Sequence, residues 1–345
     1  MSPRIALALA AAVVAAALAA PVPVLDEESY LEIAGALDAS RPYDWWRPWP
    51  PWGGEREADA FVYAHPPLFL LWVQTWVSRA GVGPNVMRAL KVAAALPLAG
   101  LLGWSVGRLA ERLTRRPWLT VGLWLAGPVV VLVLQRGLMP DLMMAAFGAL
   151  GVSGWLEGRA ASRPSLRIGW FIGGGVALAA ASWTKYPALL LIPALLLHDR
   201  SLRGQRWVFW VAFALPWLSA ESWLWALYGR PHLWEVLSRA GEITRGPLGG
   251  RTLGVATRLA LLLGPWPLLL RGWRTAWVGA LGVAGLLVLV GAPEGAEPQR
   301  LVGLLCLATP GVMLVWFALR QSFTSRPGSR GAPDRLLGAW ALFAL

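Results

Sequence analysis

The stretch IGWFIGGGVALAAASWT, residues 168–184, contains no charged side chain. Arg163 and Arg167 precede it, and Lys185 follows it directly. About 20 consecutive apolar residues are enough for an α-helix to cross the hydrocarbon core of a bilayer. Basic residues gather in the loops beside such helices on the cytoplasmic side. We therefore predict that residues 168–184 form a membrane-spanning helix.

The rest of the chain has the same character. Hydrophobic residues make up 57% of the 345 residues and charged residues only 14%, which is too apolar for a soluble domain. The further apolar segments are 4–25, 86–107, 118–135, 139–157, 187–197, 207–228, 253–270, 275–291 and 300–319. The sequence thus predicts an all-α, polytopic integral membrane protein, a single domain over residues 1–345 with about 10–11 transmembrane helices.

The N-terminal segment Met1–Ala20 resembles a secretory signal, with one basic residue, Arg4, an apolar core and small residues before Pro21. Cleavage at this point would separate the acidic residues that come next from any membrane anchor. The later apolar segments already commit the chain to the membrane, so we predict that the first helix is retained.

The formal net charge of +12 does not indicate a nucleic-acid partner, because the basic residues fall in short clusters between apolar segments. The sequence therefore predicts no nucleic-acid binding. The single cysteine, Cys306, lies inside an apolar segment. Neither a disulfide framework nor a thiolate metal cluster is expected.

The arginine clusters follow alternate apolar segments, which predicts the cytoplasmic loops. Residues 66–80 would reverse this order if they were a span. They are short, are interrupted by Gln74 and begin with Pro66 and Pro67, so we predict a juxtamembrane helix on the outer surface. The outer face then carries a first loop with juxtamembrane helices, 26–85, and a second large loop, 229–252. The cytoplasmic clusters are Arg108, Arg112, Arg115 and Arg116; Arg159, Arg163 and Arg167; Arg200, Arg203 and Arg206; Arg271 and Arg274; and Arg320, Arg326, Arg330 and Arg335.

The acidic pair Asp26–Glu27 directly follows the first apolar segment. Charged groups at a membrane boundary are costly and usually mark a site or a partner. A carboxylate here could act as general base toward an acceptor hydroxyl or hold a divalent cation, and an ordinary solvated loop is the alternative. Tyr30, Ile33 and Leu37 follow with the spacing of a short surface helix.

Three more polar residues fall on the same predicted outer face. His65 begins the surface helix, where its imidazole could approach a phosphate or simply be solvated. Asp141 begins a long apolar helix, where a role in catalysis or metal binding competes with stabilisation of the helix N-terminus. Lys185 suits an anionic lipid phosphate, and extension of its side chain to the interface is the alternative.

Arg245 and Arg300 lie on the side where the positive-inside rule predicts few basic residues, which favours an anionic ligand. Trp45 and Trp46 begin a tryptophan-rich run. Tryptophan faces bind sugars and cations, although anchoring in the interfacial aromatic belt is the commoner role.

In their order, these motifs resemble the GT-C family of membrane glycosyltransferases, in the branch of the protein O-mannosyltransferases and the lipid A aminoarabinose transferase (glycosyltransferase families 39 and 83). The resemblance covers residues 5–320 approximately. The chain departs from it at Leu301, where family members often carry Tyr. The motifs are Asp26-Glu27 with Tyr30, His65-Pro66-Pro67-Leu68, Asp141 at a helix start, Thr184-Lys185 before Pro187, and Arg300 with Pro310.

The resemblance implies the GT-C fold and transfer of a sugar from a polyprenyl-phosphate donor to a hydroxyl of an envelope acceptor. The acceptor would be a protein, lipid or glycan at the outer face of a bacterial plasma membrane, and the anomeric carbon would be inverted. It also implies that Asp26 is the catalytic or metal-binding carboxylate, with Glu27 beside it.

The remaining candidates are assigned within that expectation. Asp141 would orient the acceptor or share a divalent metal ion with Asp26. The residues expected at the donor phosphate are His65, Lys185, Arg245 and Arg300, and those expected at the acceptor or sugar are Tyr30, Trp45 and Trp46.

A transporter or translocase of lipid-linked substrates is the alternative from another functional class. Transporters usually hold ionisable groups at mid-membrane on broken helices and often show paired repeats. In this chain the polar candidates fall on one predicted face and no repeat is detectable, so the sequence favours catalysis.

Overall fold

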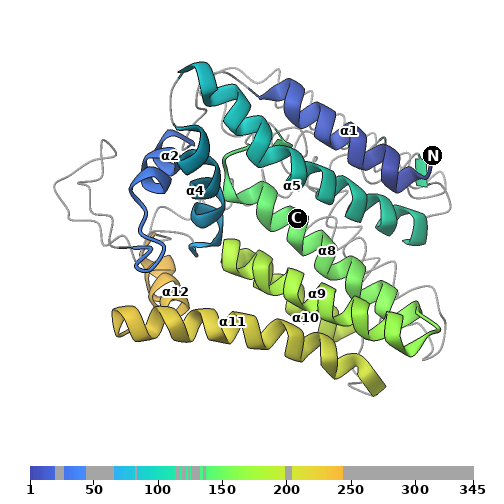
Figure 1. The fold of residues 1–345 in the computed structure, drawn as a ribbon. Coiled ribbons are helices and arrows are strands. Elements are labelled where there is room, and N and C mark those ends of the chain that lie inside the picture. The colour runs from blue at the N-terminus through green and yellow to red at the C-terminus, as the bar shows by residue number, and fades with distance from the viewer. Residues whose placement is uncertain are drawn as a thin grey trace, which may run out of the picture.

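The computed structural model describes residues 1–19, 27–43, 66–81, 84–113, 117–118, 122, 125, 133–134, 137–198 and 204–243. This part of the chain is mostly helical (Figure 1). The long helices are α1 (Pro3–Leu18), α5 (Pro84–Leu113), α8 (Pro140–Ala160), α9 (Pro164–Thr184) and α11 (Trp207–Tyr228). The shorter elements are α2 (Glu27–Ala36), α4 (Leu68–Ala80), α10 (Leu191–His198) and α12 (His232–Ile243), with the 3₁₀ turns η1 (Tyr186–Leu190) and η2 (Gly204–Arg206).

Proline and glycine mark where several of these helices begin and end. Pro3, Pro140 and Pro164 occupy the first helical positions of α1, α8 and α9, where a missing backbone N–H costs nothing. Gly229 ends α11 in the left-handed conformation, with φ of 70°, a common C-terminal cap that glycine adopts without strain. Local sequence therefore sets the lengths of these helices.

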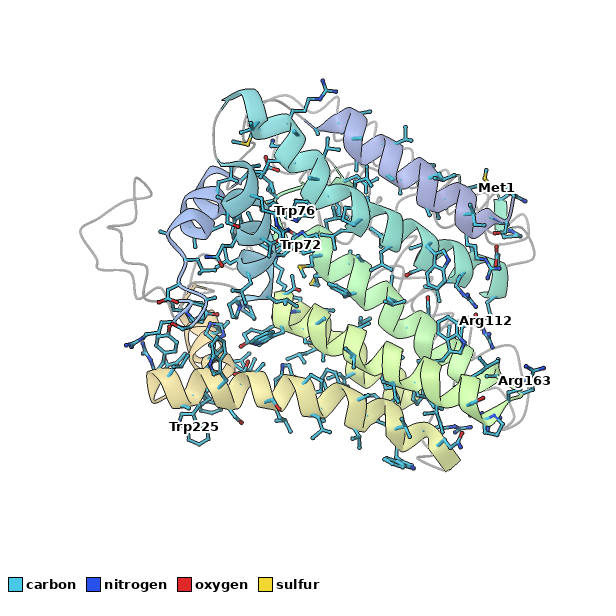
Figure 2. All side chains as sticks on the ribbon, in the orientation of Figure 1. Met1, Trp72, Trp76, Arg112, Arg163 and Trp225 are labelled. Carbon is cyan, nitrogen blue, oxygen red and sulfur yellow. The ribbon has the colours of Figure 1, made fainter. Side chains whose placement is uncertain are left out.

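The five long helices lie side by side in the order α1, α5, α8, α9, α11 (Figure 1). The short helices α2, α4 and α12 gather at one end of this row. Arg112 and Arg163 lie at the opposite end, together with Met1, whereas Trp72, Trp76 and Trp225 lie toward the end with the short helices (Figure 2). The described row thus has an arginine-bearing end and an end covered by short helices.

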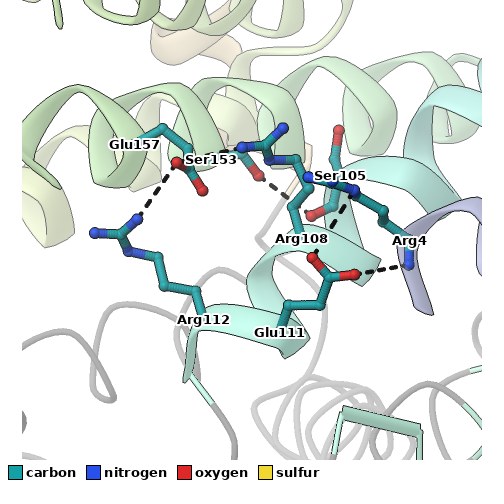
Figure 3. Close-up of polar contacts among 7 residues, drawn as sticks. All are labelled: Arg4, Ser105, Arg108, Glu111, Arg112, Ser153 and Glu157. Atoms are coloured by element: carbon teal, nitrogen blue, oxygen red, sulfur yellow. Dashed lines mark hydrogen bonds and ion pairs between the residues drawn. The ribbon is translucent and has the colours of Figure 1, made fainter. Parts of the chain in front are cut away.

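The arginine-bearing end is held by ion pairs that join neighbouring helices (Figure 3). Two guanidinium groups of α5 converge on one carboxylate of α8, and the first turn of α1 is paired with the last turns of α5. The pairs are Arg108–Glu157 at 3.3 Å, Arg112–Glu157 at 3.4 Å and Arg4–Glu111 at 3.9 Å. All of these side chains are partly exposed, so each pair contributes little stability on its own.

Two described helical stretches, Val86–Arg112 within α5 and Pro164–Thr184, are long and apolar enough to cross a membrane. The predicted spans 86–107 and 168–184 fall inside them. Among the other predicted segments, 139–157 begins at the N-cap of α8 and continues in that helix, 207–228 coincides with α11, and 187–197 divides between η1 and α10. The segments 253–270, 275–291 and 300–319, and most of 118–135, lie outside the described residues.

Helix α11 carries an exposed apolar stripe: Trp207, Val211, Leu215, Leu218 and Trp225 are 41–62% exposed. Trp207 and Trp225 are five helical turns apart on one face, a separation of about 27 Å, which is close to the roughly 30 Å of a bilayer's hydrocarbon core. Such a stripe is unfavourable in water and favourable in lipid.

The predicted juxtamembrane segment 66–80 is helical in the structure, as α4. It packs against α2 and α5, and it buries Phe69, Leu70 and Val73. Helix α12 lies in the predicted outer loop 229–252, where the sequence analysis expected no helix.

Helix α9 makes close backbone contacts with both of its neighbours. A Cβ atom on Gly154 of α8 would lie 2.5 Å from the Cα of Gly174 in α9. A Cβ on Gly175 would lie 2.3 Å from the backbone oxygen of Phe209 in α11. Small residues allow helix backbones to approach in this way, as is typical of helix packing in membranes.

This packing predicts opposite effects of two Gly→Ala substitutions. Gly154→Ala should destabilise the protein by about 1–3 kcal/mol, because the added methyl group forces α8 and α9 apart. Gly173→Ala is the matched control on α9, since nothing lies within 4 Å of its added Cβ. Thermal unfolding in detergent should show a lower midpoint for Gly154→Ala and an unchanged or higher one for Gly173→Ala. Equal midpoints would contradict the close approach.

Candidate functional site

Three groups of polar contacts lie toward the end of the row that the short helices cover. We refer to them as the Glu27–Lys91 pair, the Asp141–Lys185 pair and the Tyr186–Glu221–His232 network. They draw side chains from α2, α5, α8, α11, α12 and the segment after α9. All are formed by residues at or near helix ends, except Lys91 and Glu221, which lie within α5 and α11.

The Glu27–Lys91 pair is fully buried. The Lys91 Nζ lies 2.5 Å from Glu27 Oε2, and the side chains are 1% and 0% exposed. The Leu138 backbone N–H also donates a hydrogen bond to Glu27 Oε1, at 3.2 Å. One carboxylate therefore joins α2, α5 and the turn before α8. Its inaccessibility suits a structural role better than contact with a substrate.

The Asp141–Lys185 pair is accessible by comparison. Lys185 Nζ donates to Asp141 Oδ1 at 2.7 Å, and the side chains are 22% and 30% exposed. Asp141 is in the first turn of α8, where the helix dipole stabilises a negative charge. An ammonium group has three donors, and this contact uses one of them. An anion could therefore reach Lys185 from solvent.

The Tyr186–Glu221–His232 network begins at the residue after Lys185. The Tyr186 hydroxyl donates to Glu221 Oε1 at 2.5 Å and lies 2.6 Å from His232 Nδ1. A tyrosine hydroxyl carries one proton, so when that proton is donated to Glu221, His232 Nδ1 must supply the proton of the second hydrogen bond. In this arrangement His232 Nδ1 carries a proton.

Burial raises the pKa of the Tyr186 hydroxyl well above its usual value, and the Glu221 charge raises it further. The phenol thus remains a donor at physiological pH. Tyr43 packs beside it: its ring stacks on His232 with centroids 5.0 Å apart, and its backbone N–H donates to the Tyr228 hydroxyl at 2.9 Å. The segment after α2 is thereby attached to α11 and α12.

The three groups follow one another along two short connections. Leu138, which contacts Glu27, is three residues before Asp141, and Lys185 is bonded directly to Tyr186. A displacement of either connection would therefore affect two groups at once.

Four of the predicted site residues are described by the structure. Asp141 and Lys185, which the sequence analysis proposed separately, form one ion pair. Glu27 is in the buried pair, and Tyr30 packs edge to face against Phe69 of α4, with ring centroids 5.4 Å apart. Asp26, Trp45, Trp46, His65, Arg245 and Arg300 lie outside the described residues. Their predicted roles stay predictions.

Sequence reasoning missed Lys91, Tyr186, Glu221 and His232. Lys91 and Glu221 are ionisable residues inside the predicted apolar segments 86–107 and 207–228, a pattern that itself marks functional or paired groups. Among the described residues, no group of three or more His, Cys, Asp or Glu side chains is arranged to hold a metal ion.

Comparison with protein-family models, with curated proteins and with solved structures finds no match to this chain.

The burial of the Glu27–Lys91 pair predicts a large effect of removing one charge. Glu27→Gln should lower the free energy of unfolding by about 3–5 kcal/mol, because it removes the Glu27 charge from the buried Lys91 ammonium group. Glu235→Gln is the control, since Glu235 pairs with Arg230 at 3.7 Å in a more exposed position, where a pair contributes about 0–1 kcal/mol. Chemical unfolding in detergent micelles measures both. A loss for Glu27→Gln no larger than that of the control would contradict a structural role for the buried pair.

Proposed function

We propose that this protein is a membrane glycosyltransferase of the GT-C type, with about 10–11 transmembrane helices. It would transfer a sugar from a polyprenyl-phosphate donor to a hydroxyl of an envelope acceptor at the outer face of a bacterial plasma membrane. The observation that carries the proposal is the partly exposed Asp141–Lys185 pair, at the ends of α8 and α9 that lie opposite Arg159 and Arg163.

The pair supports binding of a lipid phosphate by exchange of partners. Without donor, Asp141 neutralises Lys185, so that no unpaired cation is held beside apolar surroundings. When the donor binds, its phosphate replaces Asp141 as the partner of the Lys185 ammonium group. Charge-assisted hydrogen bonds then hold the leaving group. The released Asp141 is then available to orient the acceptor or a divalent metal ion. His65, Arg245 and Arg300 are proposed as further phosphate ligands.

Asp26 is proposed as the general base, or as a metal ligand, on the sequence argument. It would remove the proton from the acceptor hydroxyl, whose oxygen then attacks the anomeric carbon. The bond from that carbon to the phosphate oxygen breaks, the phosphate leaves with the electron pair, and the configuration inverts. Glu27, the next residue, is held by Lys91 and by the Leu138 N–H. Tyr30, Trp45 and Trp46 remain the proposed acceptor or sugar contacts.

The proposed orientation can be tested by cysteine accessibility in intact cells. Ser40, after α2, and Ser162, between α8 and α9, are both exposed in the structure. In a Cys306→Ser background, Ser40→Cys should react with an impermeant thiol reagent added outside. Ser162→Cys should react only after the membrane is permeabilised. Labelling of both positions from one side would contradict the orientation.

If the donor phosphate replaces Asp141 as the partner of Lys185, substitutions of these two residues should have opposite effects on donor binding. Lys185→Ala should weaken binding of polyprenyl phosphate roughly ten- to a hundredfold, the effect of losing one charge-assisted contact. Asp141→Asn should strengthen binding, because the phosphate no longer competes with a carboxylate, while turnover falls. Binding to protein in nanodiscs measures both effects. If Asp141→Asn and Lys185→Ala weaken binding equally, the two residues do not exchange partners.

The Asp26→Asn variant distinguishes an enzyme from a transporter or translocase when donor binding and turnover are both measured. It should still bind polyprenyl phosphate but lose at least about a hundredfold in turnover. Sensitivity of the wild-type protein to a chelator, reversed by a divalent ion, would assign Asp26 to a metal, and indifference would assign it to proton transfer. Wild-type turnover by folded Asp26→Asn protein would remove Asp26 from the mechanism.

A further inference from the structure

The side chain of Glu221 contacts two other elements, the segment after α9 and the beginning of α12. Its side chain lies within α11 and the residue is 8% exposed. Oε1 accepts the Tyr186 hydroxyl at 2.5 Å, and Oε2 accepts the Leu233 backbone N–H at 3.2 Å. One carboxylate therefore holds both the segment after α9 and the beginning of α12.

The contact with Leu233 stabilises the N-terminus of α12. Leu233 is the second residue of this helix, and the first N–H groups of a helix have no partner within it. A carboxylate at this point satisfies one such group and complements the helix dipole. A helix of 12 residues is marginally stable in water by itself, so α12 depends on its attachments.

The contact with Tyr186 acts one residue from the proposed phosphate ligand. The backbone of Lys185 is itself tied on both sides: its N–H donates to the Ala181 oxygen at 3.0 Å, and its oxygen accepts the Ala188 N–H at 3.1 Å. Tyr186 is the next residue, so the contact that holds Tyr186 acts one peptide bond away from Lys185.

We propose that Glu221 is a positioning residue that couples α12 to Lys185 through Tyr186. The inference rests on the proposed function for the nature of the ligand, a lipid phosphate. Coupling of this kind is reciprocal: an ordered α12 favours phosphate binding at Lys185, and bound phosphate orders α12 to the same degree. His232, in the first turn of α12, adds a second hydrogen bond to the same hydroxyl.

Amide hydrogen exchange of the full-length protein in nanodiscs tests this coupling with two variants. Tyr186→Phe removes the hydroxyl and keeps the ring, and Glu221→Gln removes the charge and keeps the size. Both should speed exchange of the α12 amides roughly ten- to a hundredfold and weaken binding of polyprenyl phosphate by at least several fold.

Tyr228→Phe is the matched control. It removes a neighbouring tyrosine hydroxyl, which accepts a hydrogen bond from the Tyr43 N–H. This variant should speed exchange of the Tyr43 amide and leave phosphate affinity unchanged. Wild-type exchange across α12 in both test variants, or a loosened α12 with wild-type phosphate affinity, would overturn the proposal.

A measurement on the unmodified protein keeps the proposal testable if the variants do not fold. Saturating polyprenyl phosphate should slow exchange of the α12 amides, and bound phosphate without such slowing would overturn the coupling. Absence of phosphate binding by the wild-type protein would instead refute the proposed function. In that case, faster exchange of the α12 amides in whichever variant folds would still show that Glu221 stabilises α12.

Discussion

The arrangement at the covered end of the row depends on one buried ion pair. Glu27 and Lys91 are removed from water, so their attraction must offset a desolvation penalty of several kcal/mol per ion. The attraction offsets this penalty only when the geometry of the pair is good and the remaining lone pairs of the carboxylate accept hydrogen bonds. The Leu138 N–H donates one such hydrogen bond to Glu27. The pair thereby fixes α2 over α5 and sets the path of the turn that leads to Asp141. The short helices are held at this end by electrostatics as well as by apolar packing.

Much of the helical framework could be predicted from sequence because it depends on local properties. Predominantly apolar stretches of sufficient length predicted α5 and α9, and the proline before α4 indicated a helix start. Arg112 and Arg163, which the charge pattern assigns to the cytoplasmic side, lie at the end of the row opposite the short helices. Helix α12 was missed although Leu233, Val236, Leu237 and Ala240 recur with the spacing of an amphipathic helix, because the stretch is too short and too polar to be recognised as a span.

The site could be predicted only in part, because its contacts join residues that are distant in sequence. Asp141 and Lys185 were each recognised as charges at a helix end, yet nothing local shows that side chains 44 residues apart form a pair. Lys91 and Glu221 lie in apolar segments, and each is buried with a partner from another element. An isolated charge within an apolar segment was the available signal, and it deserves the same weight as a charge at a helix end.

The close packing of α9 has a consequence for how substitutions act at a distance. Gly174 and Gly175 contact α8 and α11 through the backbone, which leaves little room for this helix to turn or slide there. Lys185 lies ten residues beyond Gly175, about 15 Å along the helix axis. A change in the middle of the bundle can therefore move the proposed ligand-binding lysine without touching the ligand. In a mutational survey, such positions would score as affinity determinants although they lie far from any bound molecule.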